Sequence, residues 1–423
     1  MLDQEPSPTD AIVIGAGLAG LSCAILLQRA GRTVALLEAT NGVGGRVRSD
    51  MVDGFTLDRG FQVLLTAYPE AKAALDYGAL DLKSFSAGAF VQLGTKRSYI
   101  ADPRREPAAL LRTLTARVGS PLDKIRIARL QFEAKKRTPQ QCWAGKETTT
   151  REYLQSKGFS PKMVERFFRP FFGGVFLDSD LATSSRMFEF VFSMLAGGDN
   201  AIPAHGMGAI TGQLAEKLAP GTIRLRQRVA AVAPGIVTLL DQGTLRARNI
   251  VVATEGPQAA RLVQRTDVPE PGPQPVSCLY FSADEAPFAQ RSIMLNGLGA
   301  SDGPINNMCV PSNVAPALAP PGKHLVSVSV LGSHMSSSDA ELTAQVRTQL
   351  VRWFGSRANI WEHLSNYHIP HALPSQRPGV LNPHERPTAL GENLFVCGDH
   401  RDQASINGAL ASGRRTAEAI LAQ

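Results

Sequence analysis

The segment that most constrains the fold of this chain is residues 11–20, AIVIGAGLAG. Its apolar start predicts a buried strand, after which Gly15, Gly17 and Gly20 follow in the spacing GxGxxG. Glycine at these positions permits a tight turn, a close approach of backbone N–H groups to a pyrophosphate, and close packing of the next helix. The segment therefore predicts a dinucleotide-binding turn, with the positive end of a helix directed at the anion.

The two elements that follow support this prediction. A helical pattern over residues 18–30 ends at Gly31, and a second apolar strand covers residues 33–38. Glu38 ends that strand, where a carboxylate can accept hydrogen bonds from both ribose hydroxyls and disfavours a 2′-phosphate. A glycine-rich turn in an ordinary α/β domain is the alternative, but it does not account for the complete strand–helix–strand unit.

Length and composition narrow the class of protein. At 423 residues the chain exceeds the size that one hydrophobic core usually serves, so two domains are expected. The apolar run of residues 11–27 follows Asp3, Glu5 and Asp10 and is explained by its glycines, so neither an export signal nor a membrane span is expected. The five cysteines have no metal or redox spacing, which favours reduced thiols and a cytoplasmic location.

The net charge of +7 is concentrated in one segment. Between Arg104 and Arg137, ten basic residues stand against three acidic ones, an excess equal to that of the whole chain. Any field on an anionic partner must therefore come from this segment. It is interpreted either as a solvated helical face or as a docking surface for anionic lipid headgroups, which would make the protein peripheral on a membrane. Nucleic acid is not expected, because neither a recognition motif nor interleaved aromatic residues accompany the charge.

The order of elements along the chain suggests two discontinuous domains. The pattern is that of a strand over residues 55–65, and it becomes helical, with little strand signal, over residues 68–198. A later helix begins with the capping box of Ser338 and Glu341, and a last helix covers residues 405–419. Further strands are predicted at residues 222–232, 235–240, 249–254, 276–281, 325–331 and 393–397. The resulting division is a cofactor domain of residues 1–70, 200–265 and 375–423, and a substrate domain of residues 71–199 and 266–374.

Four separated motifs together resemble the FAD-dependent amine-oxidase superfamily, which contains amine oxidases, protoporphyrinogen oxidases and carotenoid or phytoene desaturases. They are GAGLAG at 15–20, GGRVRS at 44–49, VVATE at 251–255 and LFVCGDHRDQASINGALASGRRTAEAI at 394–420, in the order of the family. The first motif is generic, whereas its combination with the others is specific. The resemblance implies an α/β fold with a Rossmann-like FAD-binding domain of the GR2 type and a second, α+β substrate domain.

The resemblance also implies which residues contact the cofactor, FAD. Residues 15–20 would hold the pyrophosphate and Glu38 the adenosine ribose, while Gly45 and Arg46 would bind the phosphates from the other side. Val229 matches a backbone position that contacts the adenine. The full set of implied cofactor-binding residues is Gly15, Ala16, Gly17, Leu18, Ala19, Gly20, Glu38, Ala39, Gly44, Gly45, Arg46, Arg59, Gly60, Phe61, Gln62, Val229, Ala253, Thr254, Gly398, Asp399, Ser405, Ile406 and Ala409.

Residues 59–62 and the last helix are the parts that the resemblance places beside the flavin ring. Asp399 would bind the ribityl chain. Ser405, Ile406 and Ala409 lie where the last helix directs its N-terminus at the flavin pyrimidine, and that dipole stabilises the negative charge of reduced flavin. Packing of small residues between helices is the alternative for this C-terminal segment.

The chemistry implied is transfer of a hydride from a substrate carbon to flavin N5, for which the protein supplies orientation and a dry pocket. The catalytic base is unassigned, and His400, next to Asp399, is a weak candidate beside a structural role. Amine oxidases of the family often carry a tyrosine where this chain has Ser405 and Ile406, so no cage for a cationic amine is visible. The electron acceptor and oligomeric state are open.

Two segments, residues 169–178 and 369–378, look more like the protoporphyrinogen oxidase and desaturase branches, which act on large apolar molecules. The expected function is therefore an FAD-dependent oxidoreductase for a small-molecule substrate that is apolar, isoprenoid or tetrapyrrole-like. A flavin amine oxidase and a non-catalytic prenyl or lipid carrier that has lost flavin are the alternatives.

A dense phenylalanine cluster has two interpretations, the core of the substrate domain or the wall of an apolar channel. It consists of Phe167, Phe168, Phe171, Phe172, Phe176, Phe188, Phe190 and Phe192.

Overall fold

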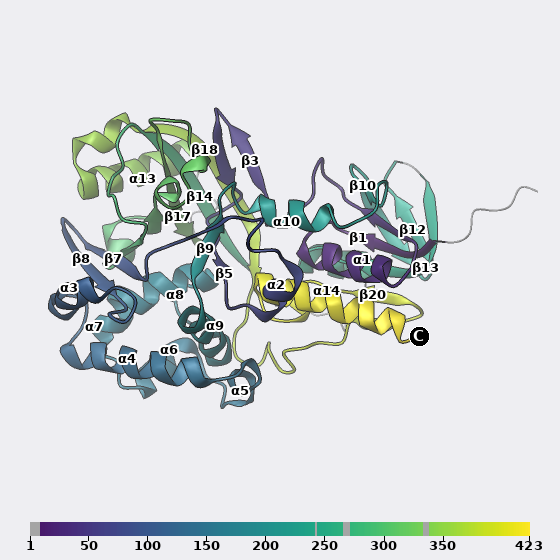
Figure 1. Cartoon of the computed structure of the whole chain (residues 1–423), viewed down its shortest axis with the longest axis horizontal. Coiled ribbons are helices and arrows are strands. Elements are labelled where there is room, and N and C mark those ends of the chain that lie inside the picture. The colour runs from purple at the N-terminus through teal and green to yellow at the C-terminus, as the bar shows by residue number, and fades with distance from the viewer. Residues whose placement is uncertain (1–8, 242, 265–270, 333–337) are drawn as a thin grey trace, which may run out of the picture.

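The computed structural model describes residues 9–241, 243–264, 271–332 and 338–423. Asp3, Glu5 and the predicted domain boundary at residues 265–266 lie outside the described residues. Figure 1 shows an elongated molecule with one sheet at its right end, and with a second sheet and a group of helices at its left end. The described residues have the mixed α/β architecture that the sequence predicts.

The first sheet has eight strands in the described part of the chain, in the order β10-β2-β1-β13-β12-β11, with β20 beside β13 and β19 beside β20. Strands β10, β2, β1, β13 and β20 pair in parallel. Most paired residues of β1, β2, β13 and β20 are buried, as expected for parallel strands covered on both faces, whereas the two residues of the edge strand β10 are not. The strands are β1 (Thr9–Ile14), β2 (Val34–Leu37), β10 (Ile223–Arg224), β11 (Val229–Ala233), β12 (Ile236–Leu239), β13 (Thr244–Val252), β19 (Ala389–Gly391) and β20 (Leu394–Val396).

Two helices from opposite ends of the chain lie side by side on this sheet. Helix α1 (Leu18–Arg29) follows β1 directly, and α14 (Ile406–Leu421) packs against it (Figure 1). The predicted strand–helix–strand unit is therefore confirmed as β1, α1 and β2. A Cβ atom on Gly413 of α14 would lie 2.2 Å from the backbone oxygen of Ala19, so the two helices approach to a distance that only glycine allows.

The second sheet has seven strands among the described residues, in the order β18-β14-β17-β16-β15-β7-β8. Helix α13 (Asp339–Phe354) has the predicted capping box, and its buried Leu342, Val346 and Leu350 join the apolar core of this lobe. The strands are β7 (Gly88–Leu93), β8 (Lys96–Ala101), β14 (Pro273–Ala283), β15 (Ile293–Asn296), β16 (Ile305–Cys309), β17 (His324–Leu331) and β18 (Glu362–Pro374).

The prediction of a helical pattern with little strand signal over residues 68–198 is wrong for its first third. Residues 82–101 form β6 (Leu82–Ser84), β7 and β8 instead. Strand β7 pairs in parallel with β15, about two hundred residues later in the chain. Strand β6 pairs with the distant β9, whereas β7 and β8 form a local hairpin that β7 connects to the rest of the sheet, so their own short patterns say little about them. The predicted strand over residues 55–65 is two strands, β4 (Phe55–Asp58) and β5 (Leu64–Leu65), on either side of the turn at Gly60.

The other elements connect the two sheets or form the helical group at the left of Figure 1. Short strands β3 (Ser49–Val52) and β4 pair with each other, and β9 (Asn200–Pro203) pairs with β5 and β6. The remaining helices are α2 (Pro69–Ala74), α3 (Leu110–Thr115), α4 (Pro121–Lys136), α5 (Pro139–Ala144), α6 (Thr150–Ser156), α7 (Pro161–Met163), α8 (Arg169–Phe176), α9 (Ser185–Gly197), α10 (Gly208–Ala215), α11 (Gly256–Val263) and α12 (Pro311–Val314), with a π-helical turn at Val164–Phe168 and 3-10 turns at Pro107–Ala109, Gly299–Asp302, Pro316–Leu318, Ser356–Ile360 and Asp399–Arg401.

The phenylalanine cluster forms the core of the helical group. Six of its eight members are buried, and Phe172 and Phe188 pack with ring centroids 4.7 Å apart. Phe167 and Phe171 are partly buried and stack on each other at the edge of this core. Of the two interpretations, the core is the one that the packing of most of these rings supports.

Candidate cofactor site

The glycine turn between β1 and α1 leaves space in front of the helix N-terminus. A Cβ atom on Gly17 would have no described atom within 4 Å, whereas one on Gly20 would lie 1.9 Å from the oxygen of Gly15. Gly17 is the N-cap residue of α1. It has no side chain to cap the helix, and the fully described first turn of α1 holds no acidic residue. Free N–H groups and the helix dipole therefore face a position that suits an anion.

Glu38 lies beside that turn, at the end of β2. Its Oε2 accepts a hydrogen bond from the backbone N–H of Ala16 at 3.0 Å, and its Oε1 accepts from the backbone N–H and hydroxyl of Thr40. The carboxylate is thus fixed at the glycine turn, while the next residue, Ala39, is exposed. Val229, at the start of β11, is held close by, because the backbone N–H of Gln227 donates to the oxygen of Glu38 at 2.8 Å.

The loop of residues 44–49 lies against the same turn. The backbone N–H of Gly44 donates to the oxygen of Ala16 at 2.8 Å, and a Cβ atom on Gly45 would approach Gly17 to 3.6 Å. Arg46 then reaches two distant parts of the chain. Its Nη2 donates to Asp399 Oδ1 at 2.6 Å and its Nη1 donates to the backbone oxygen of Ala372, on β18, at 2.7 Å. The loop therefore joins the first motif to the last.

Residues after β13 and β20 close the other side of the site. The backbone N–H of Ala253 donates to the oxygen of Ile14 at 2.8 Å, and a Cβ atom on Gly15 would lie 2.8 Å from the oxygen of Ala253. A Cβ atom on Gly398 would lie 3.5 Å from the oxygen of Thr254. The carboxyl ends of parallel strands meet at one edge of a sheet, which explains why motifs separated in sequence converge here.

The last helix begins as the sequence predicts. Ser405 is its N-cap, and its hydroxyl accepts a hydrogen bond from the backbone N–H of Gly408 at 3.0 Å. Ile406 and Ala409 lie in the first turn and are partly buried. The side chain at the position of the family tyrosine is therefore occupied in capping, and it offers no aromatic face to a cation.

The side chains of the loop of residues 59–62 lie in different parts of the molecule, and one of them is at the site. Gln62 Nε2 donates to the backbone oxygen of Arg46 at 2.7 Å, which puts this side chain at the site. The guanidinium of Arg59 instead forms a two-point ion pair with Asp50, at 2.8 and 3.0 Å. Gly60 faces β18, since a Cβ atom there would lie 2.8 Å from Ile369. Phe61 packs edge-on against Phe85, with ring centroids 6.0 Å apart.

Several buried polar atoms near Asp399 lack a hydrogen-bond partner among the described residues. They are both ring nitrogens of His400, Nδ1 of His371 and Oε1 of Gln403. Burial lowers the pKa of His400 to about 4, so its ring is neutral at pH 7. Buried polar atoms are normally satisfied, and a group with its own donors and acceptors bound here would satisfy them. Together with the space at Gly17, these atoms fit a polar cofactor such as FAD.

Sequence reasoning missed Asp58, which precedes Arg59. Its Oδ1 accepts hydrogen bonds from the Ser49 hydroxyl and, at 2.8 Å, from the backbone N–H of Met207, so it fastens the residue 44–49 loop to the start of α10. Burial raises its pKa to about 6. Its place in the same LDRGFQ run as Arg59 was the available signal. The contact of Arg46 with the carbonyl of Ala372 has no sequence signal, because a backbone oxygen is present at every residue.

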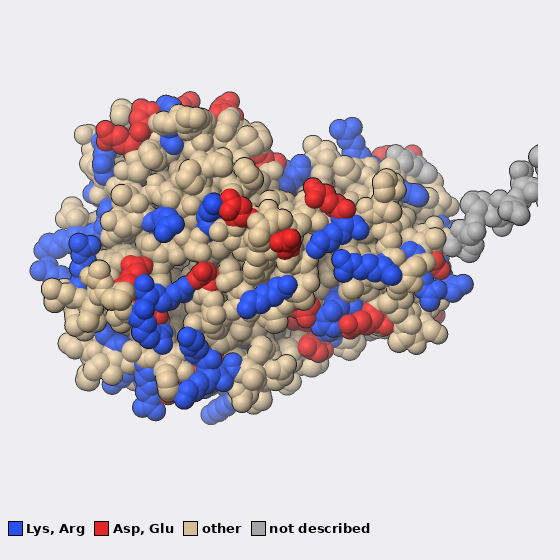
Figure 2. All heavy atoms as spheres, viewed as in Figure 1, with Lys and Arg blue, Asp and Glu red and all other residues tan. Residues whose placement is uncertain are grey.

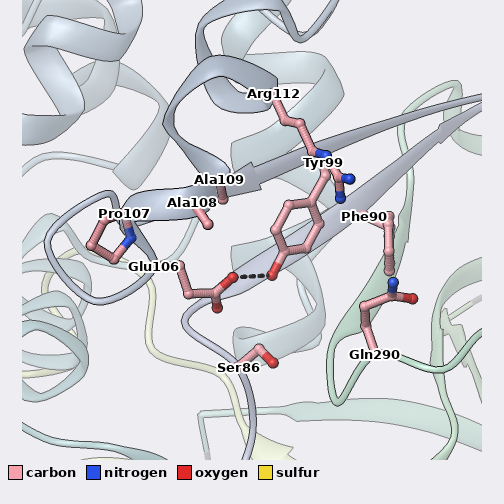
Figure 3. A pocket seen from close by; sticks show the side chains of 9 residues that line it. All are labelled: Ser86, Phe90, Tyr99, Glu106, Pro107, Ala108, Ala109, Arg112 and Gln290. Carbon is pink, nitrogen blue, oxygen red and sulfur yellow. Dashed lines mark hydrogen bonds between the residues drawn. The ribbon is translucent and has the colours of Figure 1, made fainter.

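A separate pocket of about 340 Å³ lies beside the β7–β8 hairpin (Figure 3). Its wall consists of Ser86, Phe90, Tyr99, Glu106, Pro107, Ala108, Ala109, Arg112 and Gln290. Figure 3 shows the side chains of Tyr99 and Glu106 directed at each other, with a 2.7 Å hydrogen bond from the Tyr99 hydroxyl to Oε2. This wall includes none of the predicted cofactor-binding residues.

Comparisons with known proteins identify the family of this chain. The family model of flavin containing amine oxidoreductases matches residues 18–421. Hydroxysqualene dehydroxylase of Rhodopseudomonas palustris is 26% identical over 97% of this chain and 98% of its own length. Protoporphyrinogen oxidase 2 of Arabidopsis thaliana is 31% identical over 38% of this chain, so the chain matches about a third of that relative's length.

Solved structures share the fold. An oxidoreductase of Methanosarcina mazei superposes with a TM-score of 0.76, covering 97% of this chain and all of its own, at 18% identity. The Rossmann-like arrangement predicted from the glycine motif is therefore confirmed. Because the family model spans nearly the whole chain and the residues at the glycine turn fit its cofactor, this chain belongs to the flavin containing amine oxidoreductase family and is an FAD-dependent oxidoreductase.

Proposed function

We propose that this enzyme removes a hydride from a carbon of an apolar substrate of isoprenoid or tetrapyrrole-like character. The likeness to hydroxysqualene dehydroxylase over the full length of both chains supports an isoprenoid, and the local likeness to protoporphyrinogen oxidase supports a tetrapyrrole. Bound FAD supplies the two-electron acceptor for this chemistry. The capping role of Ser405, in place of an aromatic side chain, argues against a cationic amine as substrate.

The observation that carries the cofactor site of this proposal is the ion pair of Arg46 with Asp399. It joins residues 353 positions apart, beside the glycine turn at Gly17. In the proposed complex, residues 15–20 and Arg46 bind the pyrophosphate and Glu38 binds the adenosine ribose. Asp399 binds the ribityl chain, and the N-terminus of α14 faces the flavin ring.

The other residues of this site have supporting roles in the proposal. Burial lowers the pKa of His400 to about 4, which makes it a weak proton acceptor at neutral pH, so we propose that it shapes the site.

We further propose that the cofactor domain comprises residues 1–70, 200–265 and 375–423. All five cysteines are free and buried, which supports a reducing, cytoplasmic location.

The first test is the retention of FAD by two matched variants. Arg46→Lys keeps a positive charge but replaces the guanidinium that reaches both Asp399 and Ala372, so we expect FAD to bind about tenfold more weakly or worse. Arg48→Lys is the control, because Arg48 contacts Asn41 and Asp50 rather than the last motif. FAD affinity is measured by fluorescence titration of the apoprotein. Equal affinity in both variants would contradict the proposed site.

The second test identifies the substrate class by anaerobic bleaching of the flavin absorbance. We expect polyenes or porphyrinogens to bleach it and putrescine to leave it unchanged. Bleaching by amines alone would establish the amine-oxidase alternative instead. A colourless protein that cannot be loaded with FAD would establish the non-catalytic carrier.

A further inference from the structure

Exposed apolar side chains are concentrated in one short stretch of the chain. Thirteen large apolar residues are exposed in the described part of the molecule, and six of them lie within residues 110–132. These six are Leu110, Leu111, Leu114, Leu122, Ile125 and Phe132. We call the exposed side of α3 and α4, which carries these six residues, the helical face. Single exposed apolar residues are ordinary, but a cluster of this kind marks an interaction site.

Helix α4 is apolar on two sides. Its inner side packs into the core through Ile127, Leu130 and Ala134. Its outer side repeats every three or four residues as Leu122, Ile125, Arg129, Phe132 and Lys136. Leu122 and Ile125 are 60% and 65% exposed, so their apolar character contributes nothing to the core. An amphipathic pattern directed at solvent suits a helix that lies in a lipid interface.

Basic side chains surround these apolar ones. Arg112, Arg117, Arg129, Lys135 and Lys136 are exposed on or beside the two helices. Ion pairs with Asp102, Glu189 and Asp199 bring three more acids to residues 104–137, yet basic residues still outnumber acidic ones there by ten to six. Figure 2 shows Lys and Arg side chains gathered toward the lower left of the molecule, where Figure 1 has α4 and α5.

The helical face is held as one unit. Lys124, in the first turn of α4, donates to the backbone oxygens of Leu114 and Ala116 at the end of α3. Lys136 Nζ lies 4.0 Å from the centroid of the Phe132 ring. A long basic side chain beside an exposed aromatic ring can cover apolar surface while its charge reaches a phosphate.

The pocket of Figure 3 adjoins this face. Pro107, Ala108 and Ala109 line the pocket and lead directly into α3, and Arg112 of α3 belongs to both. Its other walls include the rings of Phe90 and Tyr99. A partly apolar hollow therefore lies at the edge of the helical face.

We propose that the helical face docks on the surface of an anionic lipid bilayer, with the apolar side chains of α3 and α4 in the interface and the basic ones at the phosphates. Among the described residues, no helix combines the length and apolar character that crossing a bilayer requires. Apolar insertion combined with positive charge favours lipid over a protein partner, because each term strengthens binding to a negatively charged interface. The docking is measured without substrate, so it stands or falls separately from the proposed reaction.

The experiment is flotation of the FAD-loaded enzyme with vesicles of phosphatidylcholine, with and without about a third phosphatidylglycerol. We expect binding to the anionic vesicles that weakens as salt is raised. The combined variant Leu122→Ser, Ile125→Ser, Phe132→Ser should lower the partition coefficient about tenfold or more. Lys135→Glu with Lys136→Glu should lower it and flatten its salt dependence.

Matched controls use residues of the same kind elsewhere on the surface. Met51→Ser, Leu240→Ser, Ile360→Ser removes three equally exposed apolar side chains, and Arg246→Glu with Arg261→Glu reverses two exposed charges. FAD absorbance and the thermal midpoint report that every variant is folded. Equal partition of surface and control variants would overturn the proposal, as would wild-type enzyme that ignores anionic vesicles. A dimer that only the α4 variant dissociates, without vesicle binding, would assign the helical face to a second copy and overturn it too.

Discussion

Asp50 and Asp58 lie on the paired strands β3 and β4 beside the site. Their surroundings shift the pKa values of the two carboxyl groups in opposite directions. Asp50 is paired with Arg59 and accepts a hydrogen bond from the Tyr367 hydroxyl at 3.1 Å, so its pKa is lowered. Asp58 is partly buried and has only neutral donors, so its removal from solvent raises its pKa to about 6. One carboxylate favours the folded state when charged and the other when protonated.

We expect Asp58→Asn to stabilise the protein above pH 6. The folded state keeps the Asp58 proton to about pH 6, whereas the unfolded chain releases it near pH 3.8, so wild-type stability falls between these values. The shift corresponds to about 3 kcal/mol in the free energy of unfolding. An asparagine oxygen can still accept from Ser49 and Met207, and it has no charge to bury. Urea unfolding of both proteins at pH 4 to 8 measures the difference.

Asp50→Asn is the matched control with the opposite sign. Because the folded-state pKa of Asp50 is lowered, its contribution is present at neutral pH and is lost on acidification. The asparagine variant should therefore be less stable than wild type at pH 7 and approach it at low pH. A gain in stability at pH 7 for this variant, or none for Asp58→Asn, would show that the buried charge of Asp58 is not what sets the balance.

At the scale of elements, the contact between α1 and α14 sets the geometry of the candidate site. Both helices have their N-termini at that site. Ser22 donates from its hydroxyl to the backbone oxygen of Leu410 at 3.0 Å, close to the crossing at Gly413. Any side chain at Gly413 would push against the backbone of α1 rather than against a flexible group. The first turn of α14 would then shift relative to the glycine turn.

We expect Gly413→Ala to destabilise the fold by about 2 kcal/mol, the cost of overpacking a rigid contact, and to weaken FAD binding. Gly212→Ala on α10 is the control. A Cβ atom there would have no described atom within 4 Å, and alanine favours a helix over glycine by about 1 kcal/mol. Chemical denaturation should thus move the two midpoints in opposite directions. Two variants that both gain stability would exclude the close contact at Gly413.

Local glycine, capping and apolar patterns were sufficient to predict β1, α1, β2, the capped helix α13 and the last helix α14. They were insufficient for β6 and β7, which pair with β9 and β15 far along the chain, and for β8, whose partner is the neighbouring β7. Single residues also differ in how far the sequence predicts them. Glu38 and Arg46 belong to motifs whose residue types have a known reason, whereas Ala372 contributes only a backbone oxygen, which leaves no signal in the sequence. The exposure of Leu122 and Ile125 also required the structure, because a helix pattern does not tell which apolar stripe faces the core.

At the scale of the whole molecule, the cofactor site and the helical face are separate. The site gathers residues from the glycine turn, the residue 44–49 loop and the C-terminal segment, whereas the helical face belongs to α3 and α4. Arg46 also links the first sheet's loops to β18 of the second sheet. A ligand in the site therefore acts on both lobes, while lipid at the helical face contacts only one of them.

We expect FAD to raise the thermal midpoint of the apoprotein in a concentration-dependent manner. A ligand that binds only the folded state adds about 2.7 kcal/mol at a hundred times its Kd. The Leu122, Ile125 and Phe132 serine variant should show the same rise, because these residues lie outside the site. Differential scanning calorimetry over a series of FAD concentrations measures this. If FAD raised the thermal midpoint of the wild type but not that of the serine variant, the cofactor site and the helical face would be coupled.

The bond between Arg46 and Asp399 has a consequence for biosynthesis. Its donor is synthesised 353 residues before its acceptor. The partner of Arg46, and α14 after it, are therefore missing from every nascent chain that has not yet reached residue 399. We therefore expect fragments that end before residue 399 to retain the yellow coenzyme poorly or not at all.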